Sequence, residues 1–116
     1  MNMLKKEIKD LILEKLAEHV NLFKVILFGS FAYGKPCKDS DIDLLVVTDD
    51  DVMPATYDEN MKNFLKISAA LRDVKKNIPI DLIVHSRPMH EKFIQMGSMF
   101  SKQIIQKGEV LYEKNH

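Results

Sequence analysis

The sequence predicts an α/β protein of the α+β-like kind, in which helices flank a small mixed β-sheet. Stretches with the apolar spacing of amphipathic helices alternate with short runs rich in Val, Ile and Leu, an order typical of a sheet covered by helices. The connection between the first two predicted strands is too short for a crossover helix, so we expect this pair to be antiparallel. A chain of 116 residues suffices for one core, which predicts a single domain over 1–116.

The first half of the chain contains one predicted helix and two predicted strands. The run KVILF predicts a strand over 24–28 that ends at Gly29, and a second strand is expected over 41–48. A helix is expected over 3–20, because its apolar residues keep helical spacing. They are Leu4, Ile8, Leu11, Ile12, Leu16 and Val20.

A short helical segment is expected between these two strands. Ser30 is a suitable N-cap for residues 31–33, and Gly34 and Pro36 then end the segment.

The second half predicts two more helices, a third strand and a terminal strand. One face of a helix over 57–77 is apolar, and the run IDLIVH predicts a strand over 80–85. A proline at the first turn suits a last helix over 88–106, with a weak point at Gly97. The segment EVLYE over 109–113 is expected to form an edge strand.

The composition is that of an ordinary globular protein, 46% hydrophobic and 29% charged. Lys+Arg and Asp+Glu are equal at 17 each, which argues against a nucleic-acid surface or a polybasic membrane tether. No apolar run approaches the ~20 residues of a membrane span, and Lys5 and Lys6 do not lead into a secretory pattern. Cys37 is the sole cysteine, which excludes an intrachain disulfide. A cytoplasmic protein is therefore expected.

Two aspartates interrupt the apolar second strand. Asp41 and Asp43 are two residues apart, so their side chains leave the same face of a strand, roughly 6.5 Å apart, while Ile42 and Leu44 point into the core. Asp81 begins the third strand and reaches the same patch if the strands are neighbours; alternatively, it caps a turn. Gathered carboxylates repel by about 4 kcal/mol per pair at ~4 Å. A divalent cation removes this penalty, and oxygen ligands favour Mg²⁺ or Mn²⁺.

A Gly-Ser turn after the first strand predicts a phosphate cradle. Gly29 allows close approach to the backbone, and the segment beginning at Ser30 offers unpaired N–H groups to an anion. With the carboxylates, this turn suits a nucleoside triphosphate and its magnesium. Ser30 equally suits a helix N-cap. Lys35 is a candidate phosphate contact or a solvated loop lysine, and Ser40 is a candidate nucleotide contact or a hydrogen-bond partner for the bend into the strand.

Two other ligand-binding patterns fail on specific residues. Residues 29–35 match the P-loop pattern G-x-x-x-x-G-K, but Pro36 stands where magnesium requires Ser or Thr, and a strand begins too soon for the long helix that must follow. Three alternate aspartates from Asp39 imitate a calcium loop, but Leu44 occupies its glycine position. Neither kind of site is therefore expected.

The combined motif resembles that of nucleotidyltransferases of the DNA polymerase β type. The resemblance is carried by Gly29-Ser30, a ten-residue gap, Asp41-Ile42-Asp43-Leu44, and the later strand aspartate Asp81. More narrowly, GSFAYGKPCKDSDIDLLVV is similar to the minimal nucleotidyltransferases often paired with HEPN-domain proteins, and the resemblance covers nearly the whole chain. It implies the nucleotidyltransferase fold. Members commonly have an Arg directly after Gly-Ser, where this chain has Phe31.

The resemblance implies a role for each matching residue. Asp41 and Asp43 would bind the magnesium that chelates the triphosphate, and Asp81 would complete a second metal site and assist deprotonation of the attacking hydroxyl. Gly29 and Ser30 would hold the β- and γ-phosphates. The implied reaction is in-line attack of an acceptor hydroxyl on the α-phosphorus, with pyrophosphate leaving, under two-metal catalysis.

Two functions are consistent with the resemblance. One is an enzyme that transfers a nucleoside monophosphate, AMP from ATP, to a hydroxyl expected on a partner protein. The other is an antitoxin-like module that neutralises a HEPN ribonuclease by binding it, with little or no catalysis. Both functions predict a HEPN-domain partner. The sequence leaves open whether the chain also forms a homo-oligomer. One apolar set on the last predicted helix is expected in the core or at a partner surface: Met89, Phe93, Met96 and Phe100.

Overall fold

The structure, a computed structural model, describes residues 4–34, 40–54 and 56–114, and its elements follow the predicted order. The helices are α1 (Lys6–Ala17), α2 (Tyr57–Ala70), α3 (Arg72–Lys75), α4 (Arg87–Met96) and α5 (Met99–Lys107). The strands are β1 (Leu22–Phe28), β2 (Ile42–Thr48), β3 (Ile80–Ser86) and β4 (Glu109–Glu113). No described helix has the length and apolar character that a membrane crossing requires.

The strands form one mixed sheet in the order β3-β2-β1-β4. The pair β1–β2 is antiparallel, as the short connection predicts, and β4 also pairs antiparallel with β1. The pair β2–β3 is parallel and is joined through α2 and α3. Because of these directions, the end of β1 and the starts of β2 and β3 meet at the same end of the sheet.

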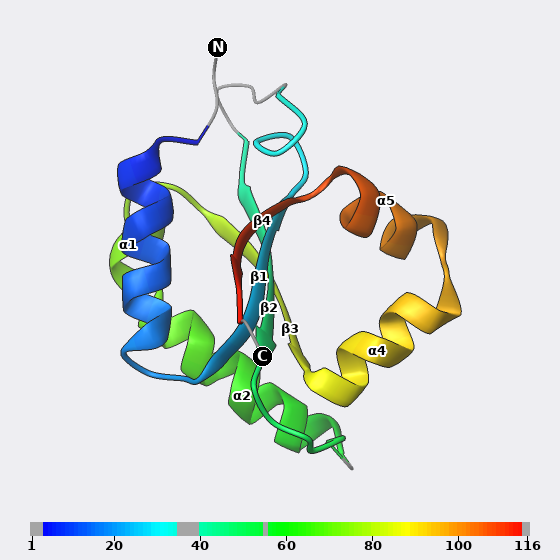
Figure 1. Cartoon of the computed structure of the whole chain (residues 1–116). Coiled ribbons are helices and arrows are strands. Elements are labelled where there is room, and N and C mark those ends of the chain that lie inside the picture. The colour runs from blue at the N-terminus through cyan, green and yellow to red at the C-terminus, as the bar shows by residue number, and fades with distance from the viewer. Residues whose placement is uncertain (1–3, 35–39, 55, 115–116) are drawn as a thin grey trace.

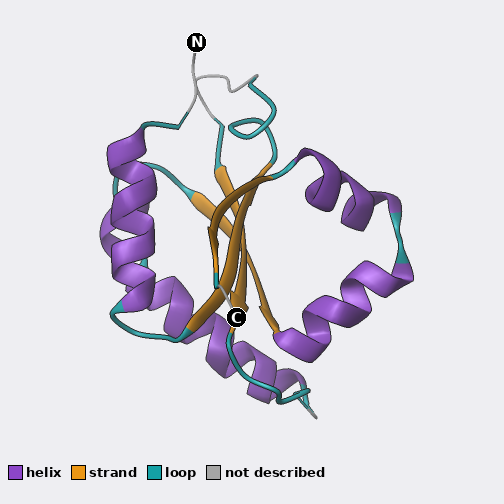
Figure 2. Ribbon diagram, in the orientation of Figure 1, coloured by secondary structure: helices purple, strands orange, loops and turns teal. Residues whose placement is uncertain are grey.

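Helices cover both faces of the sheet (Figures 1 and 2). On one face, α1, α2 and α3 enclose the main core, which includes Leu27 and Leu44 from the sheet. On the other face, α4 and α5 lie over a smaller cluster that includes Ile26, Leu45 and Ile104. The alternation of buried residues along β2 thus assigns even positions to the first face and odd positions to the second.

Two predicted helices are each divided in the structure. The helix expected over 57–77 is broken at Leu71, whose φ of −95° and ψ of 9° leave the helical region. The last helix breaks at the predicted weak point, because Gly97 adopts φ +58° and ends α4. The hydroxyl of Ser98 then accepts a hydrogen bond from the N–H of Ser101 and begins α5.

Candidate active site

The turn that follows β1 is built around Gly29. Its φ of +74° lies in the left-handed region that favours glycine. Its carbonyl accepts hydrogen bonds from the N–H groups of Ala32 and Tyr33, both at 3.0 Å. Residues 30–34 form a turn and not a helix, so the short helical segment predicted after Ser30 is wrong. An anion at this position would meet the N–H groups of a turn.

Gly29 also lies directly against Asp43. The residue before it, Phe28, is the partner of Asp43 in the β1–β2 ladder. A Cβ atom at Gly29 would stand 1.9 Å from Oδ2 of Asp43 and 2.9 Å from its Cγ, closer than such atoms approach in proteins. The missing side chain therefore makes room for the carboxylate, a function of Gly29 that the sequence motif alone does not reveal.

Asp43 and Asp81 are direct partners in the parallel β2–β3 pair. Partner residues project to the same face of a sheet, so the predicted proximity of these two carboxylates is confirmed. The N–H of Ile42 donates to the carbonyl of Pro79 at 2.9 Å and fixes the register where the pair begins. Asp41 lies one residue before β2, which begins one position later than predicted. Three carboxylates thus share one end of the sheet.

The electrostatics of Asp43 follow from this crowding. Burial raises the pKa of the Asp43 carboxyl above its ordinary value of 3.8, and the neighbouring charges of Asp81 and Asp41 raise it further. Asp43 is partly buried, whereas Asp41 and Asp81 are exposed. Within the described part of the chain, no ion pair involves any of the three. The group therefore attracts a cation.

The three carboxylates suit a hard divalent cation by their chemistry. Carboxylate oxygens are the donors that Mg²⁺ and Mn²⁺ prefer. Over residues 4–34, 40–54 and 56–114, however, no three Asp, Glu, His or Cys side chains are gathered closely enough to hold a metal ion. Substrate phosphates commonly complete the coordination of Mg²⁺, so the arrangement fits a cation that arrives with a triphosphate.

The other predicted site residues lie around this turn. Ser30 is partly buried within it, and Ser40 is partly buried directly before Asp41; Lys35 lies outside the described residues. Phe31, which directly follows the Gly-Ser pair, packs against the main core on the α1 face. This position therefore supplies apolar contacts to the fold and no charge to the site.

An aromatic cluster next to the carboxylates is not evident from the sequence. The ring of Phe28 contacts that of Phe100 on α5 at a centroid distance of 5.8 Å, and Phe100 contacts Phe93 on α4 at 6.2 Å. Phe93 in turn lies 5.1 Å from the ring of His85, which neighbours the buried His90. These residues come from four different elements. The sequence therefore indicated only the members on the last predicted helix, Phe93 and Phe100.

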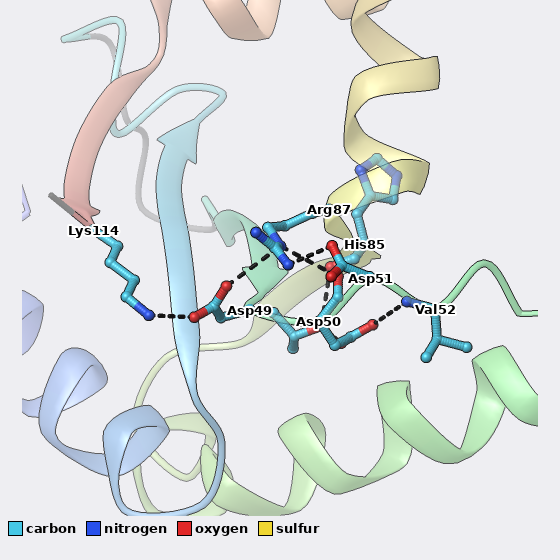
Figure 3. Close-up of polar contacts among 8 residues, drawn as sticks. Asp49, Asp50, Asp51, Val52, His85, Arg87 and Lys114 are labelled. Atoms are coloured by element: carbon cyan, nitrogen blue, oxygen red, sulfur yellow. Dashed lines mark hydrogen bonds and ion pairs between the residues drawn. The ribbon is translucent and has the colours of Figure 1, made fainter. Parts of the chain in front are cut away.

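Acidic residues at the opposite end of β2 are neutralised (Figure 3). Asp49 pairs with Arg87 at the start of α4, with an Nε–Oδ1 distance of 3.3 Å, and also with Lys114. Arg87 pairs further with Asp51. The loop over 49–51 is therefore ion-paired. A cavity of about 370 Å³ opens at this end, beside Asn21, and does not include the carboxylates of the candidate site.

A mixed sheet with a Gly-Ser turn and carboxylates gathered at one end is the arrangement that the resemblance to nucleotidyltransferases predicts. Residues 10–116 match the family described as Polymerase beta, Nucleotidyltransferase. The chain belongs to this family and is an enzyme of the nucleotidyltransferase class.

One protein of similar sequence and two solved structures are similar to this chain. A Methanocaldococcus jannaschii protein named as a protein adenylyltransferase is 34% identical over 89 residues, which are 77% of each chain. A Sulfolobus solfataricus structure named as a nucleotidyltransferase gives a TM-score of 0.60 at 20% identity, covering 93% of this chain and 82% of that one. A chain from a complex of tri-AMPylated Shewanella oneidensis HEPN toxin with MNT antitoxin gives 0.53 at 18% identity, covering 96% and 74%. The predicted nucleotidyltransferase fold is thus confirmed.

Proposed function

We propose that this chain transfers AMP from ATP to a hydroxyl group of a partner protein, with residues 1–116 acting as one minimal catalytic domain. The observation that carries the proposal is the position of Asp43, which lies beside Asp81 and against the turn at Gly29. A protein acceptor is supported by the relative named as a protein adenylyltransferase. A HEPN-type acceptor is supported by the matched complex with an AMPylated HEPN toxin. ATP as the donor is supported by a toxin–antitoxin structure with AMP-PNP. That structure matches at a TM-score of 0.57 and 21% identity, covering 92% of this chain and 74% of that one.

In this proposal the donor nucleotide binds between the turn and the carboxylates. Gly29 and Ser30 hold the β- and γ-phosphates through backbone N–H groups of the turn, and Lys35 and Ser40 are further nucleotide contacts. The carboxylates described above hold Mg²⁺ or Mn²⁺ together with the phosphates. When bound, the ion neutralises the charge that develops on the departing pyrophosphate.

The reaction then needs an acceptor in line with the bond that breaks. The acceptor oxygen forms a bond to the α-phosphorus, the bond from that phosphorus to the bridging oxygen of pyrophosphate breaks, and AMP remains on the acceptor. The proton of the hydroxyl passes to Asp81, whose carboxylate is exposed. Holding the acceptor in this geometry supplies much of the rate enhancement.

A partner protein is favoured by apolar side chains left exposed on α4 and α5. Met96 is 73% exposed and Met99 is 88% exposed, and Ile94 and Ile105 are exposed on the same two helices. Flexible methionine side chains at a surface suit a protein contact. The same surface supports a second candidate function, an antitoxin-like module that neutralises a HEPN ribonuclease by binding it.

Labelled ATP distinguishes these functions. The chain and a HEPN-type partner are incubated with Mg²⁺ and either α-labelled or γ-labelled ATP. We expect the partner to acquire the α-label only. Asp43→Asn should abolish the transfer, and Asp10→Asn on α1 should preserve it, because that aspartate is exposed and, among the ion pairs of the described residues, pairs only with Lys6 on its own helix. Transfer of the γ-label would mean a kinase, and a stable complex without either label would leave the binding module as the function.

A further inference from the structure

We infer that Phe100 of α5 is the platform on which the base of the bound nucleotide stacks. This inference rests on the proposed function, since it assigns a place to the part of ATP that neither the turn nor the carboxylates can hold. Stacking on an aromatic ring is a general way to bind a base, because every base presents a π face.

Phe100 combines a fixed position with an open surface. Its ring meets Phe28 edge-on, at 5.8 Å and 82°, and Phe93 edge-on, at 6.2 Å and 83°. Even so, 48% of Phe100 is exposed. A ring held by two neighbours loses little conformational entropy when a ligand covers its free surface. An aromatic side chain of this kind is prepared for stacking.

The position of Phe100 matches the geometry of the site. Phe28 is the β-ladder partner of Asp43, so both side chains project to the face covered by α4 and α5. The strand spacing and the 5.8 Å ring contact together place the Phe100 ring on the order of 10 Å from Asp43. A ribose and its phosphates can bridge such a gap. In Figure 1, α5 lies near the end of the sheet where the turn follows β1.

No other described Phe or Tyr side chain offers the same combination. Besides Phe100, only Tyr112 is exposed among those that the structure describes. Tyr112 pairs with Val25, whose side chain belongs to the main core on the α1 face. Its ring therefore projects to the side of the sheet opposite Asp43 and cannot meet the same nucleotide.

Binding of Mg²⁺-ATP compared with Mg²⁺-tripolyphosphate tests the inference by calorimetry. Phe100→Leu keeps apolar contact with Phe28 and Phe93 but removes the aromatic face. We expect ATP to bind about fivefold to 150-fold more weakly, since base–aromatic stacking contributes on the order of 1–3 kcal/mol and 1.4 kcal/mol is tenfold. Tripolyphosphate affinity should be unchanged. Leu65→Met, at an exposed apolar position of α2 on the other face of the sheet, is the matched control and should alter neither affinity.

A second variant gives a direct signal. The chain contains no tryptophan, so the fluorescence of the F100W variant reports on that position alone. We expect ATP to quench it and tripolyphosphate to leave it unchanged, while the L65W control on α2 responds to neither.

The outcomes separate the inference from the proposed function. Equal loss of both ligands in Phe100→Leu, unchanged ATP affinity, or no quenching of F100W at saturating ATP would each overturn the stacking role while the phosphate site stands. If the unsubstituted chain binds neither ATP nor tripolyphosphate, the proposed function fails and the inference fails with it.

Discussion

Replacing Asp43 by asparagine is expected to stabilise the protein in the absence of ligand and to abolish its response to nucleotide. The substitution keeps the shape of the side chain and removes the negative charge that lies beside Asp81. At the ~4.8 Å spacing of adjacent strands, two charges repel by about 3.5 kcal/mol at an effective dielectric of 20 and by about 0.9 kcal/mol in bulk water. Because Asp81 and Asp41 are exposed, water screens the repulsion strongly. We therefore expect a gain of about 1 kcal/mol, or about 4 °C in Tm for a domain of this size.

With ligand present, the unsubstituted chain should become more stable than the Asp43→Asn variant. A triphosphate with Mg²⁺ at one hundred times its Kd stabilises the protein that binds it by about 2.7 kcal/mol. The unsubstituted chain should gain this increment, and the Asp43→Asn variant should not. Thermal unfolding with and without Mg²⁺-ATP measures both effects in one experiment. Asp10→Asn serves as the control, since an exposed aspartate on α1 should change stability by less than about 0.5 kcal/mol.

The pH dependence of stability also tests whether the charge of Asp43 destabilises the ligand-free protein. The pKa of Asp43 is raised in the folded state, so the folded protein binds more protons than the unfolded chain between the ordinary carboxyl pKa of 3.8 and the raised value. Stability from this group therefore falls as pH rises through that window. The advantage of Asp43→Asn should be present at pH 7 and disappear below the ordinary pKa. A ligand-free variant less stable than the parent at pH 7, or one with an unchanged nucleotide response, would refute the reasoning.

Three further predictions concern the turn, the aromatic cluster and the exposed surface. Gly29→Ala should destabilise the fold far more than Gly34→Ala, because both glycines have positive φ but only the Cβ at position 29 would meet Asp43; equal losses on denaturant unfolding would contradict this contact. Burial lowers the pKa of His90 to about 4, so its contribution to stability, complete above the ordinary pKa of 6.5, is lost as pH falls through about 4. His90→Phe should reduce the loss of stability between pH 7 and pH 4 by up to about 3 kcal/mol, and an unchanged acid response would count against it. Met99→Asp should weaken a complex with a HEPN-type partner by at least tenfold in a binding assay while ATP affinity is retained; an undisturbed complex would place the partner elsewhere.

Local patterns were sufficient to predict most of the sheet and the centre of the candidate site. The short connection between 28 and 41 requires an antiparallel pair, and the connection through 57–77 allows the parallel pair that follows. Alternation along a strand then sends Asp41 and Asp43 to one face. Only the assumption that the second and third strands are neighbours was needed to bring Asp81 to the same place.

Features that depend on long-range packing could not be predicted in this way. The break at Leu71 has no glycine or proline to announce it, and a fully buried leucine keeps the apolar spacing that suggests one continuous helix. The contact between Phe28 and Phe100 joins residues 72 positions apart in the chain, and no periodicity encodes it. The sequence motif also assigns Gly29 to the phosphates, whereas its contact with the Asp43 carboxylate appears only when β1 and β2 are paired.

The two ends of β2 show why the carboxylates at its start are best explained by a ligand. At the far end, Asp49 is compensated by Arg87 and Lys114, so negative charge there binds separate parts of the chain together. At the near end, Asp43 lies beside Asp81 with no cationic partner among the described residues. Its pKa is raised, first by burial and then by the charges of Asp81 and Asp41. A domain whose only requirement was stability could use asparagine there without losing a described contact. The two ends of β2 thus differ: acidic residues at one end stabilise the fold through ion pairs, whereas those at the other end repel one another, a repulsion that the metal cation of the proposed function would relieve.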